Sequence, residues 1–209
     1  MKYLSGQANY DKFPNVEVKG YEHAAVRSWE HIVDTIEQRI QGQDKHILVI
    51  DTYHGVNHNE ILDQLVAPLS PALVVSMDDA KYSEEHIFAM LERNITDDRV
   101  FGVIAPHKLD EFFDSEKLQQ LKQTVTDADS GLIVVLGHGA RLVAEGDTFI
   151  YADLARWEIQ QRFRRGELGN WAQKTTTRMY YVNTNARSLL NGESSTVIRL
   201  SCCLTLIFY

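Results

Sequence analysis

The sequence predicts an α/β fold in three layers, with a parallel sheet covered by helices on both faces. Short unbroken apolar runs, such as HILVI at 46–50 and GLIVVLG at 131–137, are typical of strands buried on both faces. Segments with the apolar spacing of amphipathic helices separate these runs. This alternation favours parallel strands joined by helical crossovers.

The first half of the chain predicts two strands and three helices. Apolar residues at three-four spacing predict a helix over 21–40: Val26, Trp29, Val33, Ile36 and Ile40. HILVI then forms the first strand, and a helix over 59–69 stops near Pro71 because proline cannot continue a helix. ALVVSM at 72–77 is the second strand, and 78–95 is the third helix.

The second half continues the alternation. RVFGVIA at 99–105 predicts a third strand, and 109–125 predicts a helix. GLIVVLG is a fourth strand, followed by a shorter strand over 147–152 and a helix over 153–166. We therefore expect a single α/β domain in this part of the chain.

Composition and charge narrow the class of protein. The chain has 209 residues and a net charge of −8, which argues against nucleic acid or an anionic membrane as the main partner. No apolar run approaches the roughly 20 residues that cross a bilayer. The N-terminus lacks the apolar core of a secretory signal, so a cytoplasmic location is expected. Cys202 and Cys203 are adjacent, which suggests neither a disulfide framework nor a cysteine metal site.

The candidate site lies at the carboxyl ends of the strands, where open parallel sheets bind ligands. Four turns are predicted there, at 51–59, 77–81, 105–108 and 137–141. The first, DTYHGVNHN, stands where nucleotide-binding proteins have a phosphate loop. Its candidates for contact with a phosphate or another ligand are Asp51, Tyr53, His54, Gly55 and Asn57.

This turn lacks the residues of a working phosphate loop. In the pattern G-x-x-x-x-G-K-[ST], glycines let backbone N–H groups approach the phosphate, Lys contacts its outer oxygens and Ser/Thr holds magnesium. Here only Gly55 remains, while His58, Asn59 and Glu60 stand where Lys and Ser/Thr would be. The Glu60 carboxylate would also oppose a phosphate at the helix N-terminus. We therefore predict a degenerate phosphate loop with no catalytic residue.

The histidines of this turn are better explained by hydrogen bonding than by a metal. Asp51, His54 and His58 could converge on zinc, which needs at least three ligands. Their spacing spans a turn of unknown shape, whereas loop histidines that form hydrogen bonds and cap the helix are common. No metal site is predicted.

The remaining candidates lie after the second and fourth strands and in the last helix. Asp78 and Asp79 stand where a kinase holds a general base or a magnesium ligand, and they equally suit a helix N-cap. Small residues flank His138 in LGHGAR, which fits either a close ligand contact or a tight turn. Arg156 and Arg162 are candidates for binding phosphate, although a solvated cationic helix end is the simpler interpretation.

Four segments resemble the N-terminal region of large bacterial proteins of the class I mannose-6-phosphate isomerase family. They are YDKFPNVEVKGYEHAAVRSWEHI, HILVIDTYHGVN, RVFGVIAPHKLDEFFD and YADLARWEIQQRFRRGELGNW. In that family, a domain similar to uridine-kinase-like phosphate-loop proteins precedes a cupin-type isomerase domain. The resemblance covers about residues 10–172 and implies a kinase-like fold with a degenerate phosphate loop.

The resemblance also implies an activity that this chain does not carry alone. The family interconverts mannose 6-phosphate and fructose 6-phosphate, with zinc held by histidines and carboxylates of the cupin barrel. No cupin-like segment is present, so no catalytic or zinc-binding residue carries over and no cofactor is expected in this chain. The missing cupin domain is the expected partner.

Residues 174–209 depart from the family pattern and are expected to be an aberrant tail. If each codon over 178–192 is read from the third base of the printed one, Met179, Tyr180 and Tyr181 force Val-Leu, as in the family segment EDVLRKYKRAFFIEWRVADRHK. The other positions allow that segment in the same register. A frameshift is therefore expected, with a tail that is poorly ordered or weakly docked.

These observations divide the chain into three parts. Residues 1–45 are an N-terminal extension with an amphipathic helix, 46–173 the degenerate kinase-like domain, and 174–209 the tail. The favoured interpretation is a truncated, non-catalytic fragment of an isomerase-family protein. A small-molecule kinase with unusual loop residues remains an alternative, as does a regulatory domain that binds a sugar phosphate or nucleotide.

Overall fold

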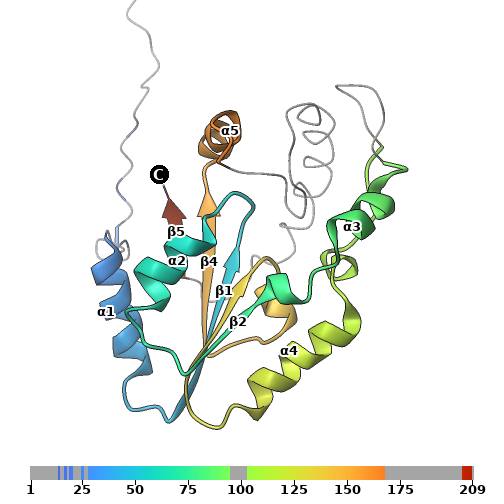
Figure 1. The fold of residues 1–209 in the computed structure, drawn as a ribbon. Helices are drawn as coiled ribbons and strands as arrows, with labels where there is room; N and C mark the ends of the chain where they lie inside the picture. The colour runs from blue at the N-terminus through green and yellow to red at the C-terminus, as the bar shows by residue number, and fades with distance from the viewer. Residues whose placement is uncertain are drawn as a thin grey trace, which may run out of the picture.

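The computed structural model describes residues 28–94, 103–167 and 204–208, together with residues 14, 17, 19, 20 and 25. Within this part of the chain, five parallel strands form one sheet in the order β2-β3-β1-β4-β5 (Figure 1). The strands are β1 (Lys45–Thr52), β2 (Leu73–Ser76), β3 (Gly131–Gly137), β4 (Thr148–Leu154) and β5 (Leu204–Phe208). The parallel sheet predicted from the sequence is therefore confirmed.

Helices cover both faces of the sheet, which confirms the three-layer fold (Figure 1). One face carries α1 (Trp29–Ile40) and α2 (His58–Ile61), which continues into the π-helical turn η1 (Leu62–Val66). The other face carries α3 (Glu84–Leu91) and α4 (Ser115–Asp127), and α5 (Arg156–Arg164) follows β4. Three short 3₁₀ segments complete the described elements: η2 (Met77–Asp79), η3 (Leu109–Phe112) and η4 (Ala140–Leu142). Among the described helices, none has the length and apolar character needed to span a bilayer.

The central strand β1 contributes to the cores on both faces. Leu48 and Ile50 pack with α1 and η1, whereas Val49 packs against the α3 and α4 side. All three side chains are fully buried. This explains the unbroken apolar run in the sequence, because successive side chains of a strand point to opposite faces and both faces are covered.

The predicted third strand is wrong over its described part. Residues 103–108 form no strand, and 99–102 lie outside the described residues. The buried side chain of Asn94 donates hydrogen bonds from Nδ2 to the carbonyls of Val103 (3.1 Å) and Ile104 (3.2 Å). The Asn94 carbonyl accepts the N–H of Val103. These backbone groups are satisfied by Asn94 and not by a strand ladder.

Capping residues place the helix starts later than predicted. The helix predicted over 78–95 begins after Ser83, whose hydroxyl accepts the N–H of His86. The helix predicted over 109–125 is divided, because Asp114 accepts the N–H groups of Glu116 and Lys117 and starts α4 there.

The first and last helices are also shorter at their starts than predicted. α1 begins after Ser28, which accepts the N–H of His31, and residues 21–24 lie outside the described part. α5 begins at Arg156 because β4 extends to Leu154.

β5 is the described part of the predicted tail. Its backbone pairs with β4 from Ile150 opposite Leu204 to Leu154 opposite Phe208. The expectation of a poorly ordered or weakly docked tail did not include such a strand. The rest of 174–209, with both cysteines, lies outside the described residues.

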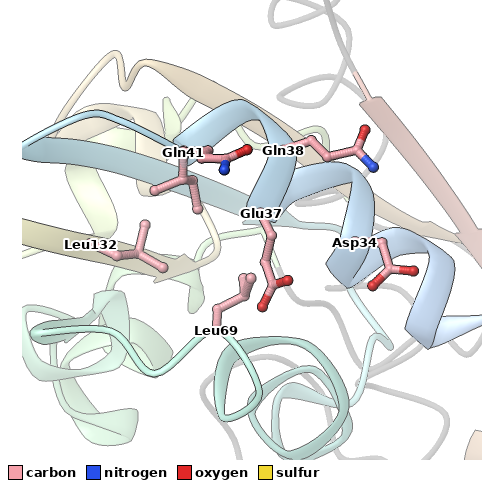
Figure 2. Close-up of a pocket in the computed structure, with 7 residues that line it drawn as sticks. Asp34, Glu37, Gln38, Gln41, Leu69 and Leu132 are labelled. Carbon is pink, nitrogen blue, oxygen red and sulfur yellow. The ribbon is translucent and has the colours of Figure 1, made fainter.

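A cavity of about 460 Å³ lies beside α1 at the amino end of the sheet (Figure 2). Its apolar surface comes from Ile40, Leu69 and Leu132. Polar side chains of α1 and the residue that follows it complete the lining: Asp34, Glu37, Gln38 and Gln41. This cavity is at the opposite end of the strands from the predicted phosphate-loop turn.

Candidate functional site

The carboxyl ends of β1, β2 and β3 form the candidate site. β1 and β3 are neighbours, with Asp51 opposite Gly137. After β1 the chain enters the α1 and α2 face, since Ile61 belongs to that core, whereas after β3 it enters the opposite face with Ala140. Ligands of open α/β sheets bind at a reversal of this kind.

Asp51 is the buried carboxyl group of this site, with 3% of its surface exposed. Its Oδ1 accepts a hydrogen bond from the backbone N–H of Gly139 at 3.0 Å. Its Oδ2 has no hydrogen-bond partner within the described residues. Burial raises the pKa of Asp51 to about 6, and the N–H groups of Gly139 and Arg141 only partly oppose that rise. This carboxyl group therefore titrates close to neutral pH.

A chain of polar contacts links the end of β1 to the end of β2. Thr52 Oγ1 lies 2.9 Å from His58 Nε2, and His58 Nδ1 lies 3.6 Å from Asp78 Oδ2. Lys81 Nζ donates to Asp78 Oδ1 at 2.7 Å. The close contact with His58 and then the hydrogen bond from Lys81 hold the pKa of the Asp78 carboxyl well below its usual range. Asp78 is therefore an ionised acceptor at the strand end.

His138 supplies a neutral imidazole to the same region. Burial lowers its pKa to about 4, and a positive charge on His58 acts in the same direction. Its ring meets that of His54 edge to face, with 6.5 Å between the ring centroids. The neutral ring can both donate and accept a hydrogen bond at pH 7.

The turn between β1 and α2 has the position of a phosphate loop without its chemistry. Gly55 is buried and adopts φ of 98°, a conformation that favours glycine. Asn57 caps α2 through Oδ1, which accepts the N–H of Asn59 at 3.1 Å. The first helical residues are His58 and Asn59, so neither a lysine ammonium nor a hydroxyl stands there.

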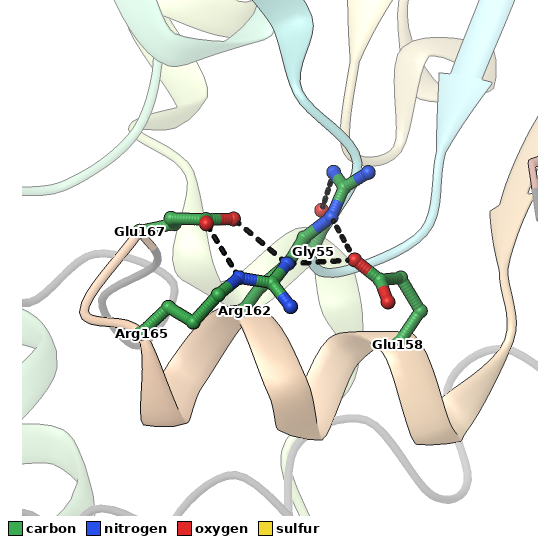
Figure 3. Close-up of polar contacts among 5 residues, drawn as sticks. All are labelled: Gly55, Glu158, Arg162, Arg165 and Glu167. Carbon is green, nitrogen blue, oxygen red and sulfur yellow. Dashed lines mark hydrogen bonds and ion pairs between the residues drawn. The ribbon is translucent and has the colours of Figure 1, made fainter.

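Helix α5 covers this turn and is attached to it at two points (Figure 3). Arg162 Nη1 donates to the carbonyl of Gly55 at 3.1 Å, and Arg162 Nε donates to Glu158 at 3.2 Å. The ring of Phe163 lies 5.6 Å from that of His54. Arg162 thus lies against the turn, with its guanidinium held by Gly55 and Glu158, and its role in binding phosphate stays a prediction.

The other arginines of α5 are separate from the turn. Arg165 donates to Glu158 at 2.8 Å and to Glu167, so it shares the Glu158 carboxylate with Arg162 (Figure 3). Arg156 is exposed at the start of α5, and within the described residues no hydrogen bond or ion pair joins it to the turn. The candidate role of Arg156 in binding phosphate therefore stays a prediction.

The two interpretations of the acidic pair after β2 can now be separated. Ser76 caps η2 and Ser83 caps α3, so the N-cap interpretation of Asp78 and Asp79 is wrong. Both residues are exposed, and Asp78 contacts His58 and Lys81.

Two further predicted positions, Tyr53 and the segment 105–108, make structural contacts. The backbone N–H of Tyr53 donates to the carbonyl of Ala152, which attaches the turn to β4. The segment 105–108 does not end a strand, and His107 there pairs with Glu111.

Sequence reasoning did not single out three residues of the site. Thr52 resembled an ordinary strand residue, and Lys81 was noted only as part of its turn. Phe163 resembled a helix core position. The spacing of Lys81 three residues after Asp78 was the available signal. Within the described residues, no group of three or more His, Cys, Asp or Glu side chains is placed to hold a metal ion.

Comparisons with known proteins give a family and a fold. A family model described as "Domain of unknown function (DUF8485)" matches residues 28–183. A search of curated proteins finds no match. The crystal structure of a "putative fructose transport system kinase" from Silicibacter sp. TM1040 is similar, with 16% sequence identity and a TM-score of 0.54. The likeness covers 87% of this chain and 100% of that chain, and at this identity it shows the fold alone.

Proposed function

The chain belongs to the DUF8485 family, and we propose that it binds a sugar phosphate or nucleotide on a kinase-like scaffold without transferring a phosphoryl group. The observation that carries this proposal is the position of His58 and Asn59 at the start of α2. Phosphate-loop enzymes use a lysine and a hydroxyl here to contact the phosphates and magnesium. His58 is instead engaged between Thr52 and Asp78.

Retained binding is supported by polar groups at the reversal between β1 and β3. Asp51 Oδ2 is buried with no described partner, and His138 presents a neutral ring nearby in the same strand-end region. A buried polar atom without a hydrogen bond is costly, so a ligand hydroxyl that satisfies it would gain affinity. A hydroxyl-rich ligand such as a sugar phosphate or a nucleotide fits this chemistry.

The resemblance to isomerase-family proteins supports mannose 6-phosphate as the first ligand to test. In a longer protein, the domain would then sense the substrate or product of an attached cupin isomerase domain. The interconversion of mannose 6-phosphate and fructose 6-phosphate, with its zinc, would reside in that cupin domain. We propose a regulatory role for the present domain in such a protein.

Calorimetry with the purified chain tests this proposal. We expect binding of at least one ligand among mannose 6-phosphate, ATP and UTP, with an affinity that magnesium does not change, and no release of ADP. Asp51→Leu should weaken binding at least about tenfold, because it removes the buried acceptor. The exposed Asp79→Asn variant is the matched control. If the chain binds none of mannose 6-phosphate, ATP and UTP, the proposal is wrong for these three ligands.

A small-molecule kinase is the second candidate, and the ionised Asp78 at the end of β2 favours it. A carboxylate at this position can accept the proton of a substrate hydroxyl during phosphoryl transfer. The similar structure is described as a kinase of a fructose transport system, so fructose with ATP and magnesium is the first substrate pair. Release of ADP that Asp78→Asn lowers about 100-fold or more would establish this activity and reject the non-catalytic proposal.

A further inference from the structure

The cavity beside α1 has an apolar floor and an acidic rim (Figure 2). Ile40, Leu69 and Leu132 form the floor, and the exposed side chains of Asp34 and Glu37 lie at the rim. Within the described residues, neither carboxylate takes part in an ion pair. We call this surface the α1 groove. It suits an apolar group that carries positive charge at its edge.

The outer side of α5 presents a group of this kind. Trp157 is 66% exposed, and the guanidinium of Arg164 lies 5.8 Å from the centroid of its ring. Arg156, next to Trp157 in the chain, is also exposed. We call these three residues the α5 patch. An exposed tryptophan beside arginine is unusual on a free surface and is the combination most enriched in protein-interface hot spots.

We propose that the α5 patch of one copy of this chain docks into the α1 groove of a second copy. Trp157 would lie on the apolar floor, and its neighbouring arginines would face Asp34 and Glu37. The volume of the cavity, about 460 Å³, is within the range of small-ligand sites and is large enough to receive an indole ring. The charges of the two surfaces are opposite, which favours this pairing and its register.

The contact joins two different surfaces, so it is head to tail. The groove is at the amino end of the sheet, whereas α5 lies beyond the carboxyl ends (Figure 1). A head-to-tail contact leaves one groove and one patch available at the ends of each assembly, and association continues past a dimer unless a ring closes. One tryptophan buries only about 150–250 Å², so the association is weak and depends on concentration.

Sedimentation of the full chain over a concentration series, from about 5 to 500 µM, tests the proposal. We expect the average mass to rise beyond two copies, and Trp157→Ala to lower the association constant at least about tenfold. Phe88→Ala is the matched control, because Phe88 is also exposed (38%) but lies on α3. A monomer at every concentration would overturn the proposal, as would equal association by the Trp157 variant.

Charge reversal identifies the two surfaces. Arg164→Glu or Glu37→Lys alone should weaken association at least several-fold, and the double variant should recover most of it, because the reversed charges attract again. Glu30→Lys is the control for Glu37, since Glu30 is an exposed acid of α1 outside the cavity lining. If the double variant associates no better than the single ones, a different surface or partner occupies the groove and the proposal is wrong.

Discussion

The carboxylate of Asp51 accepts the backbone N–H of Gly139 at 3.0 Å, which joins the ends of the two central strands. This contact fixes the turn after β3 against β1 and removes the Asp51 side chain from water. Burial removes the hydration of the carboxyl group, and the N–H groups of Gly139 and Arg141 replace it only in part, so its ionised form is disfavoured in the folded state.

Asp51→Asn is expected to stabilise the protein at neutral and alkaline pH. The pKa of Asp51 rises from 3.8 to about 6 on folding, so ionisation lowers the free energy of unfolding as pH rises through this window. The asparagine of the variant does not ionise, so the variant's free energy of unfolding does not fall in this pH window. We expect no change near about pH 4 and a gain of roughly 1–3 kcal/mol near about pH 8, measured by urea unfolding. Equal effects at both pH values would contradict the assignment, and the exposed Asp79→Asn is the control.

Gly139→Ala should destabilise the fold by about 1–3 kcal/mol. Gly139 has φ of 72°, and an added Cβ would lie 3.0 Å from Leu109 Cδ2 and 3.2 Å from Leu142 Cδ1. Gly42→Ala is a matched control, because its φ is 81° but nothing lies within 4 Å of the added atom. Equal losses in urea unfolding would show that backbone strain alone is responsible.

His58→Gln should raise the pKa of Asp78 toward its ordinary value of 3.8, because the close contact with His58 is the main cause of its depression. Carbon NMR titration of the carboxyl group measures the shift. A depressed pKa stabilises the fold above the ordinary pKa, and this stability is lost as pH falls through the folded value. The variant should therefore lose less stability on acidification than the natural chain. His86→Gln, at the exposed ring stacked on Tyr82, should leave the Asp78 titration unchanged.

Arg162→Met should increase hydrogen exchange in the turn around Gly55. The variant keeps an apolar stem but loses the 3.1 Å bond to the Gly55 carbonyl, so local opening of the turn becomes easier by about 1 kcal/mol. Arg164→Met is the control, since Arg164 lies over Trp157 on the outer side of the helix. Exchange mass spectrometry that finds the same protection in both variants would show that α5 does not hold the turn.

The sequence predicted the strands of the central sheet because a strand that is buried on both faces consists of an unbroken run of apolar residues. RVFGVIA is a similar apolar run, yet its described residues form no strand, because the Asn94 side chain donates hydrogen bonds to the carbonyls of Val103 and Ile104. That outcome depends on a side chain in the turn after α3, which the apolar run itself does not encode. The predicted helix starts were wrong for a related reason: the starts of α3 and α4 depend on the individual capping side chains of Ser83 and Asp114.

The site was predictable in its location and less so in its contacts. Asp51 lies at the end of β1, Asp78 and His138 follow strands, and the rule that parallel strand ends converge made them candidates. Arg162 lies 107 residues after Gly55, and their contact depends on the direction in which α5 leaves β4. Sequence spacing alone does not specify that direction.

The hydrogen bonds of Asn94 have a practical consequence for protein engineering. The buried Asn94 side chain holds the carbonyls of Val103 and Ile104, so the chain before residue 95 and the chain after residue 102 are anchored side by side. The entropic cost of a longer connection between fixed ends grows by only about 0.6 kcal/mol for each doubling of its length. A fluorescent reporter or an affinity tag inserted between these anchors is therefore expected to cost the sheet little stability.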